Sequence, residues 1–442
     1  MFSASFISSL RAPWLPAVAL LGAAWLLLPN ANAQANAQAQ PALGLEQALQ
    51  AAQARSRQLV AHGAAASAAR EMAHAAGQLP DPVLKAGIND LPVNGPDRFS
   101  LTQDFMTQRS IGFAQEFTRA DKRQARERRF EREADAANAS HALALANLRR
   151  DTAVAWLERH NQERMLGILR AQRAEASLQV EAAEAVYRGG RGAQADVFAA
   201  RTAVAQIDDR ILQTERLVDT ANTRLARWIG NASNQPLGAP PDLSALPVDA
   251  ARLEAQLERQ PELVLLARQL DVARAEADIA QSSKKADWSA ELMYSQRGPA
   301  YSNMVSINFS VPLQVDSANR QDREVAAKLA LADHARAQLE EATRERLAET
   351  RTWLQEWQSN RARLTQYDSA LIPLASERTR AALAAYRGGA GPLSAVLEAR
   401  RMEIDTRADR LRLETETATL WAQLEYLIPP EHAAVAAAPE QP

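Results

Sequence analysis

The same glycine-rich segment occurs twice in this chain, and each copy lies between two long stretches that contain no cluster of proline or glycine. Residues 185–192 read AVYRGGRG, and residues 384–391 read AAYRGGAG. The residues that follow also correspond, since Val197 matches Val396. A repeat unit of this length indicates a duplicated domain rather than a solenoid of short repeats.

The stretches on either side of each glycine-rich segment are rich in residues that favour helices. Hydrophobic residues make up 47% of the chain but aromatic residues only 5%, so alanine provides much of the apolar surface. A helix of about 70 residues is roughly 100 Å long and is stable only when its apolar stripe is buried against other helices. The sequence therefore predicts a mainly α fold with a small β part, in which a duplicated coiled bundle of long helices covers residues 44–78, 119–188, 193–230, 249–283, 316–387 and 392–427.

Each half also contains two short segments in which apolar and polar residues alternate. The clearest lies at 303–313, where Val305, Ile307 and Phe309 alternate with polar residues. Alternation over about ten residues matches the length of a transmembrane β-strand. An ordinary soluble hairpin with one face on a core has the same pattern, so the periodicity leaves both interpretations open. The other three segments lie at 84–89, 110–117 and 287–295.

The membrane interpretation has a consequence for assembly. Four strands cannot close a barrel, and a membrane tolerates no open sheet edge, so several chains would have to share one barrel. The expected fold then consists of the helical bundle plus four transmembrane strands per chain that contribute to a trimeric β-barrel.

The N-terminus has the three-part pattern of a secretory signal. Arg11 precedes an apolar run over residues 12–28, and the Ala-Asn-Ala that ends at Ala33 has the spacing that a signal peptidase recognises. We expect cleavage between Ala33 and Gln34, which assigns residues 1–33 to a signal peptide. The alternative is an uncleaved anchor, because the run is nearly long enough to span a membrane.

Proline and glycine are concentrated between the two halves, at residues 235–248, which we interpret as a linker. The expected domains are a first repeat at 34–234 and a second repeat at 249–428. Each repeat has a helix, a pair of strands and a long helical hairpin. The last residues, 429–442, are expected to form a flexible tail.

Composition and spacing argue against several classes of function. The 51 basic and 53 acidic residues leave a formal charge of -2, which does not favour nucleic-acid binding. The chain contains no cysteine, which excludes disulfides, thiolate ligands and a lipid-modified cysteine. The histidines form no HExxH or similar ligand spacing, and no catalytic triad or carboxylate pair has supporting context. We therefore expect no enzyme activity, no cofactor and no fixed metal centre.

Taken together, these features resemble the TolC-type outer-membrane efflux proteins, over nearly the whole chain that follows the signal peptide. The most specific matches are the two Tyr-Arg-Gly-Gly turns and the segments DVFAAR at 196–201 and AVLEAR at 395–400. The resemblance implies that a homotrimer shares one β-barrel in the outer membrane and a helical tunnel across the periplasm. It also implies two protein partners, a periplasmic adaptor and an inner-membrane pump, with substrate passing passively to the exterior.

The segment around the first pair of strands resembles one branch of that family, the heavy-metal cation efflux (CzcC/CusC-like) proteins. It reads PDPVLKAGINDLP at 80–92 and QEFTRADKR at 115–123. That branch serves proton-driven pumps, so the resemblance implies heavy-metal cations as substrate. Drug efflux and type I protein secretion are the alternatives within the family. A periplasmic coiled-coil adaptor or a tethering protein is the alternative outside it.

The resemblance places the two turns at the periplasmic tip, where the adaptor docks and the tunnel narrows. Glycine tolerates positive φ, so we expect a β-branched residue at Gly189 or Gly388 to strain the turn. A phosphate-binding loop is disfavoured, because no strand precedes the glycines and no Lys-Ser/Thr pair follows them. The predicted docking residues are Tyr187, Arg188, Gly189, Gly190 and Gly192 in the first turn and Tyr386, Arg387, Gly388, Gly389 and Gly391 in the second.

Asp196 and Glu398 lie at the start of the helices that follow the turns. The resemblance places acidic residues there, at the constriction of the tunnel, where a trimer would have a ring of six carboxylates that attracts cations. The matching positions in the opposite repeats are Ala395 and Ala199, so the ring is split between two levels. The alternative is that each carboxylate only helps its helix to start, through the helix dipole.

Overall fold

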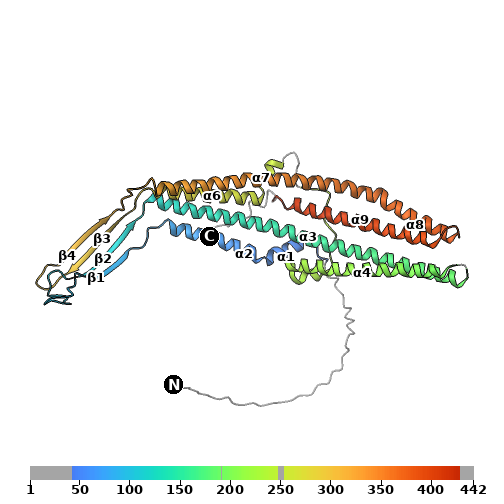
Figure 1. Cartoon of the computed structure of the whole chain (residues 1–442), viewed down its shortest axis with the longest axis horizontal. Helices are drawn as coiled ribbons and strands as arrows, with labels where there is room; N and C mark the ends of the chain where they lie inside the picture. Colours follow the sequence, from blue (N-terminus) through green and yellow to red (C-terminus); the bar gives the residue numbers. More distant parts are fainter. Residues whose placement is uncertain (1–41, 191, 247–252, 429–442) are drawn as a thin grey trace, which may run out of the picture. The chain divides into compact units, whose positions relative to one another are not determined.

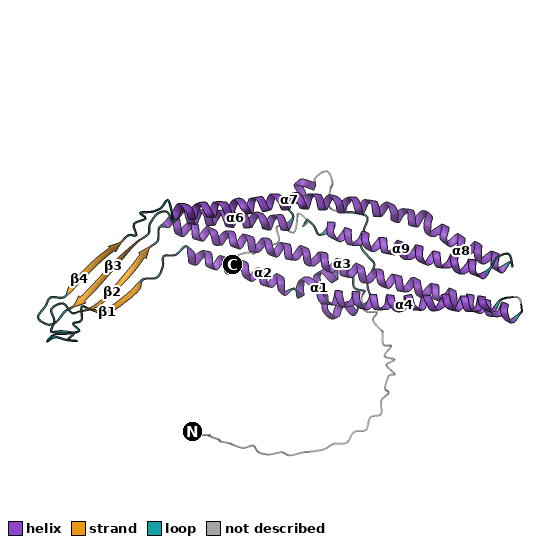
Figure 2. Ribbon diagram, viewed as in Figure 1, coloured by secondary structure: helices purple, strands orange, loops and turns teal. Residues whose placement is uncertain are grey.

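The computed structural model describes residues 42–190, 192–246 and 253–428. The predicted signal peptide, with its cleavage site at Ala33 and Gln34, and the predicted tail at 429–442 lie outside these residues. The described chain consists of long helices and one small sheet (Figures 1 and 2). The predicted fold class, mainly α with a small β part, is confirmed.

The helices of the first half follow the prediction closely, with one interruption. They are α1 (Leu45–Arg55), α2 (Arg57–Ala76), α3 (Ala120–Arg188), α4 (Gln194–Ile229) and η1 (Gly230–Asn234). The predicted helix at 44–78 is divided at Ser56, whose backbone is extended and whose hydroxyl accepts a hydrogen bond from the Leu59 N–H at 3.3 Å. Ser56 therefore ends one helix and caps the next, a role that suits its short polar side chain.

The helices of the second half are interrupted twice where the sequence predicted continuous segments. They are α5 (Leu253–Leu257), α6 (Pro261–Ser282), α7 (Gln321–Gln366), η3 (Tyr367–Leu371), α8 (Ile372–Arg387) and α9 (Leu393–Glu425). The predicted helix at 249–283 breaks before Pro261, which begins α6 where a missing N–H costs nothing. The predicted helix at 316–387 contains a π-helical turn, η3, just before Pro373. In a regular α-helix the ring of that proline would clash with the carbonyl four residues earlier.

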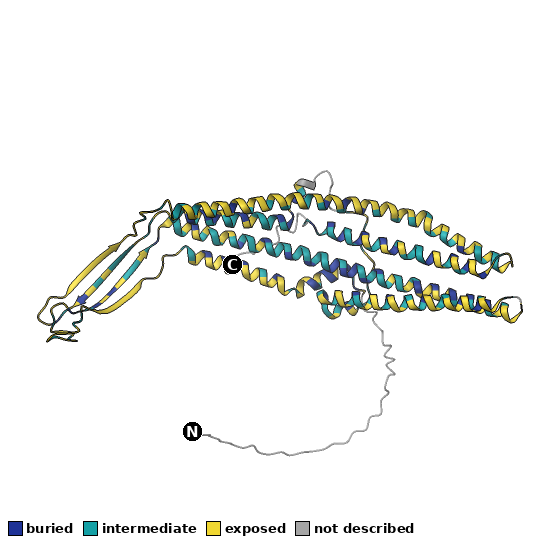
Figure 3. Cartoon of the chain, viewed as in Figure 1, coloured by how far each residue is buried: buried dark blue, intermediate teal, exposed yellow. Residues whose placement is uncertain are grey.

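The helix α3 is the central element of the bundle, because it packs against α2, α4, α6 and α9. In addition, α6 packs on α7, and α8 packs on α9 (Figure 1). Many buried positions are alanines, such as Ala66, Ala139 and Ala176, whose small side chains let neighbouring helices approach closely. In Figure 3, buried and exposed residues accordingly alternate along the helices.

The largest hydrophobic cluster lies around Trp156 in α3 and Trp421 in α9. The indole N–H of Trp156 donates to the Leu43 carbonyl at 3.1 Å, and that of Trp421 donates to the Ala245 carbonyl at 3.1 Å. Leu237 packs against the same cluster and forms a parallel bridge with Leu43. The described part of the stretch at 235–248 is therefore held against the bundle.

The four strands form one antiparallel sheet in the order β1-β2-β3-β4. They are β1 (Val83–Asn89), β2 (Gln108–Phe117), β3 (Trp288–Gln296) and β4 (Met304–Ser310). Because β2 comes from the first half and β3 from the second, their pairing joins the two strand pairs that the sequence predicted separately. Within the described residues, β1 and β4 have no strand on their outer sides.

The register of the sheet places the alternating apolar residues on one face, as the periodicity predicted. Leu84, Phe113, Leu292 and Ile307 form one row across the four strands. All four are more than half exposed. The opposite face carries mostly polar or small residues, such as Lys85, Glu291 and Asn308, although Val83, Met293 and Met304 also lie on it. The sheet is therefore mainly apolar on one side and mainly polar on the other, with the apolar side uncovered.

Candidate functional site

The first two glycines of each glycine-rich turn make the same backbone hydrogen bonds. The Gly189 N–H donates to the Ala185 carbonyl at 3.0 Å, and the Gly190 N–H donates to the Tyr187 carbonyl at 2.9 Å. In the second copy, the corresponding bonds from Gly388 and Gly389 measure 2.9 and 3.0 Å. Both turns thus satisfy the last carbonyls of the preceding helix in the same way.

The expectation that Gly189 and Gly388 require a positive φ is wrong. Their φ angles are -78° and -79°, which other residues adopt freely. The positive φ falls on the next residue, 68° at Gly190 and 72° at Gly389. The reason is that the first glycine closes the helix as its C-cap, and the left-handed residue comes one position later.

The third glycine of each turn lies close to the preceding helix, where an added side chain would have little room. A Cβ atom at Gly192 would lie 3.0 Å from Val186 Cγ1 and 3.3 Å from the Tyr187 nitrogen. At Gly391 it would lie 3.3 Å from Ala385 Cβ. The chain therefore folds back tightly against the helix that it has just left.

Beneath the turns, the ends of the two hairpins share one small hydrophobic cluster. The repeated valines Val197 and Val396 are both buried in it, together with Ala183 from α3. The two tyrosines of the turns differ, however. Tyr386 packs against the cluster, whereas Tyr187 is 44% exposed. Of the two tyrosines, Tyr187 is thus the one available at the surface of the single chain.

The structure places the two predicted constriction carboxylates in different environments. Asp196 is half-buried in the first turn of α4, and Glu398 is exposed in the second turn of α9. Neither forms an ion pair or a side-chain hydrogen bond with the residues that the structure describes. The helix-dipole explanation therefore suits Asp196 but not Glu398, because the dipole acts within the first turn.

Ion pairs of arginine connect the helices above the turns, and sequence reasoning did not identify them. Arg210 of α4 pairs with Asp405 of α9 at 2.7 Å. Arg410 of α9 donates to both carboxylate oxygens of Asp368 in η3, at 2.7 and 3.0 Å. This hydrogen-bonded pairing holds the pKa of the Asp368 carboxyl below its usual range. The excess of arginine over lysine was the available signal, since the planar guanidinium suits such two-pronged contacts.

Glu403 of α9 is the most enclosed carboxylate of this network, with an exposed fraction of 5%. Burial by itself would raise its pKa, but hydrogen bonds from Ser376, Thr379 and Arg407 outweigh burial and hold the pKa below its usual range. The Ser376 hydroxyl lies 2.8 Å and the Arg407 guanidinium 2.9 Å from the Glu403 Oε1 atom. The carboxylate thus joins α8 to α9 while it remains ionised.

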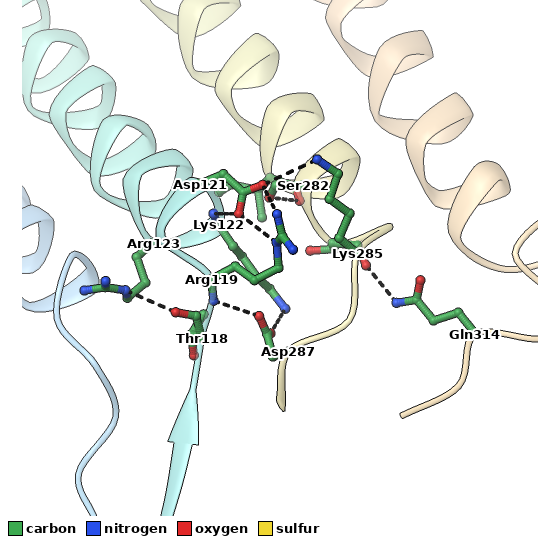
Figure 4. A network of polar contacts seen from close by, with 11 residues as sticks. Thr118, Arg119, Asp121, Lys122, Arg123, Ser282, Lys285, Asp287 and Gln314 are labelled. Carbon is green, nitrogen blue, oxygen red and sulfur yellow. Dashed lines mark hydrogen bonds and ion pairs between the residues drawn. The ribbon is translucent and has the colours of Figure 1, made fainter. Parts of the chain in front are cut away.

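A second polar network lies where the sheet meets the helices (Figure 4). Asp287, just before β3, accepts hydrogen bonds from the Arg119 N–H at 2.9 Å and from the Lys122 Nζ atom at 2.7 Å. Burial alone would raise the pKa of Asp287, but these two donors hold it below its usual range. Arg119 also pairs with Asp121 at 3.1 Å. The network ties the start of β3 to the start of α3, so it fixes the sheet to the bundle.

The described residues lack two further features. No group of three or more His, Cys, Asp or Glu side chains is arranged there to hold a metal ion. None of the described helices combines the length and the apolar character needed to cross a membrane.

No family model matches the sequence, and no curated protein matches it. Solved structures do match the fold. The outer-membrane channel OprN superposes with a TM-score of 0.71 and 18% identity, over 87% of this chain and 90% of OprN. VceC, an outer membrane protein of Vibrio cholerae, superposes with a TM-score of 0.71 and 19% identity, over 87% of this chain and 95% of VceC. CusC, solved in a study of transmembrane channel formation, superposes with a TM-score of 0.69 and 15% identity, over 87% of this chain and 92% of CusC. The chain therefore has the fold of these proteins over most of its length.

Proposed function

We propose that this chain is the outer-membrane channel of a tripartite efflux system and that three copies share one β-barrel and one helical tunnel. In this proposal a signal peptide exports the chain, the sheet lies in the outer membrane and the helices cross the periplasm. The channel conducts substrate passively and has no catalytic centre. The similarity in fold to OprN, VceC and CusC supports the proposal.

The exposed apolar face of the sheet is the observation that carries the proposal. On the edge strand β4, Val305, Ile307 and Phe309 are 66%, 64% and 72% exposed. Exposed apolar surface costs roughly 25 cal/mol per Å² in water, a cost that contact with lipid removes. The opposite face offers serine, asparagine, lysine and glutamate side chains, which suit a water-filled lumen.

The two free sheet edges support the sharing of one barrel. In a membrane, the unpaired backbone groups of β1 and β4 need partners, and the opposite edge of another copy supplies them. Two copies would give about eight strands, a barrel whose interior is filled by side chains. Three copies give about twelve strands, which leaves room for a channel.

The adaptor is proposed to dock at the two glycine-rich turns. They lie at the far end of α3 from the sheet, roughly 100 Å along the helix, a distance suited to reaching across the periplasm. Tyr187 is exposed there, and Asp196 and Glu398 lie just beyond the turns. The inner-membrane pump, which we propose to be proton-driven, would feed substrate into the tunnel at this end.

Heavy-metal cations are the proposed substrate, and the resemblance of residues 80–92 and 115–123 to that branch supports this. The fold alone does not distinguish substrates, because CusC is no more similar to this chain than OprN or VceC. A periplasmic adaptor or tethering coiled coil is the weaker alternative, since neither function explains a sheet with an uncovered apolar face.

Fractionation of cells that express the full chain tests the proposal. We expect the protein in the outer-membrane fraction, migrating as a trimer on SDS gels without heating and as a monomer after heating. An outer-membrane porin serves as the marker for the fraction. Release of a monomer together with the soluble periplasmic proteins would refute the proposal and support the adaptor or tether.

A further inference from the structure

One ion pair crosses the polar face of the sheet. The Lys85 Nζ atom of β1 lies 2.6 Å from the Glu291 Oε2 atom of β3, so the pair reaches over the intervening strand β2. The β2 residues beneath it are Gly112, opposite Lys85, and Ala114, opposite Glu291. Because neither has a bulky side chain, the two charged groups meet above the strand.

Charge is scarce on this face. Among the strand residues, Lys85, Glu291 and Glu116 are the charged groups that the register places there, and Glu116 lies near the helices, opposite Ser289. Lys85 and Glu291 therefore cancel one another near the middle of the sheet. The side chain of Lys85 is 47% exposed and that of Glu291 20%. Ion pairs as exposed as this contribute little to stability, so stability alone does not account for the pair.

We propose that the Lys85–Glu291 pair keeps the middle of the lumen of the barrel electrically neutral, so that charge selection takes place elsewhere along the channel. The inference rests on the proposed function, in which the polar face of the sheet lines the lumen. Three copies place three such pairs around the passage. Unpaired charges of one sign in a passage with low-dielectric walls concentrate ions of the opposite sign, whereas closely paired charges largely cancel. Neutral walls let a cation leave without being retained.

Two single substitutions separate the charges. Glu291→Gln leaves three unpaired lysines at the middle of the lumen, and Lys85→Gln leaves three unpaired carboxylates there. In planar bilayers with a KCl gradient, we expect the reversal potential to shift towards anion preference in Glu291→Gln and towards cation preference in Lys85→Gln. Both shifts should be large near 0.01 M salt, where the Debye length is about 30 Å, and small near 1 M, where it is about 3 Å.

The double variant Lys85→Gln with Glu291→Gln is the matched control, since it removes both charges and should keep the reversal potential of the parent. The exchange Lys85→Glu with Glu291→Lys should do the same. Equal reversal potentials in the parent and in both single variants would overturn the inference, because a pair that only joins β1 to β3 alters trimer stability and not selectivity. If the purified parent trimer forms no channels at all, both the inference and the proposed function fail. If channels form and only the shifts are missing, the proposed function stands.

Discussion

Arginine substitutions in β4 distinguish a lipid-facing side from a lumen-facing side of the sheet. Ile307 is the midpoint of β4 and lies in the same row as Leu292, the midpoint of β3, so in the proposed barrel it lies at mid-membrane. Arginine at such a depth on a lipid-facing side costs ~2–4 kcal/mol in each protomer, which amounts to ~6–12 kcal/mol in a trimer. Phe309 lies two residues, about 7 Å, nearer the helices, so Phe309→Arg should cost about half as much.

The assay is the fraction of SDS-resistant trimer and its midpoint of unfolding in urea. Ile307→Arg should abolish most of the trimer, because each 1.4 kcal/mol corresponds to about tenfold in the equilibrium. Ser306→Arg and Asn308→Arg are the matched controls, since they flank Ile307 on the polar face and should assemble normally. Equal assembly of Ile307→Arg and the two controls would refute the assignment of the faces.

The absence of cysteine from the chain allows an independent check of the same two faces. A membrane-impermeant thiol reagent should label Asn308→Cys through the aqueous lumen and leave Ile307→Cys unlabelled in the assembled membrane protein. Labelling of Ile307→Cys alone would reverse the assignment of lumen and lipid.

Three further predictions concern the turns, the constriction carboxylates and Glu403. Gly190→Val with Gly389→Val should strain each turn by about 1–3 kcal/mol, because a β-branched residue does not hold a positive φ. The variant should show less in-cell crosslinking to the adaptor while the trimer stays intact. Asp196→Ala with Glu398→Ala should reduce cation selectivity, and also block by multivalent cations from the periplasmic side, in single-channel recordings. Glu403→Gln should make stability less dependent on pH in acid. The folded pKa of Glu403 lies below the unfolded value of about 4.3, so its contribution is complete above that value and is lost as the pH falls through the folded pKa. Urea unfolding at neutral pH and near pH 3 measures the difference.

Each of these predictions has a contradicting outcome. Gly388→Ala is the control for the turns, because φ at Gly388 is negative and an added Cβ would lie in ordinary contact with the Ala384 and Ala385 carbonyl oxygens, at 3.4 and 3.8 Å. Crosslinking at the parental level in the double valine variant would show that the turns merely connect helices. Unaltered selectivity in the double alanine variant would remove Asp196 and Glu398 from the constriction. A loss of stability in acid as large in Glu403→Gln as in the parent would place the acid sensitivity in other groups.

Periodicity in the sequence predicted where the long helical segments lie and which face of each strand is mainly apolar, but not the interruptions at Ser56, before Pro261 and at η3. The predicted helix at 119–188 is observed as α3, and Val305, Ile307 and Phe309 lie on one side of the sheet as expected. Both patterns depend only on neighbours along the chain, since a helix repeats every 3.6 residues and a strand every two.

Where local chemistry allows more than one outcome, the sequence narrowed the choice without deciding it. A serine can lie inside a helix or cap one, and the structure shows that Ser56 caps α2. Three glycines in each turn are able to hold a positive φ, but only the hydrogen bonds of the preceding helix place it at Gly190 and Gly389.

The tertiary structure alone decided which distant segments meet. The two strand pairs form one sheet because β2 pairs with β3. Within that sheet, Lys85 contacts Glu291 although 206 residues separate them. The burial of Val197 with Val396 beneath the turns was decided in the same way. A periodic pattern shows which face of a helix or strand is apolar. The element that covers or pairs with that face is determined by strand register, side-chain packing and charge, which exist only once the elements have come together.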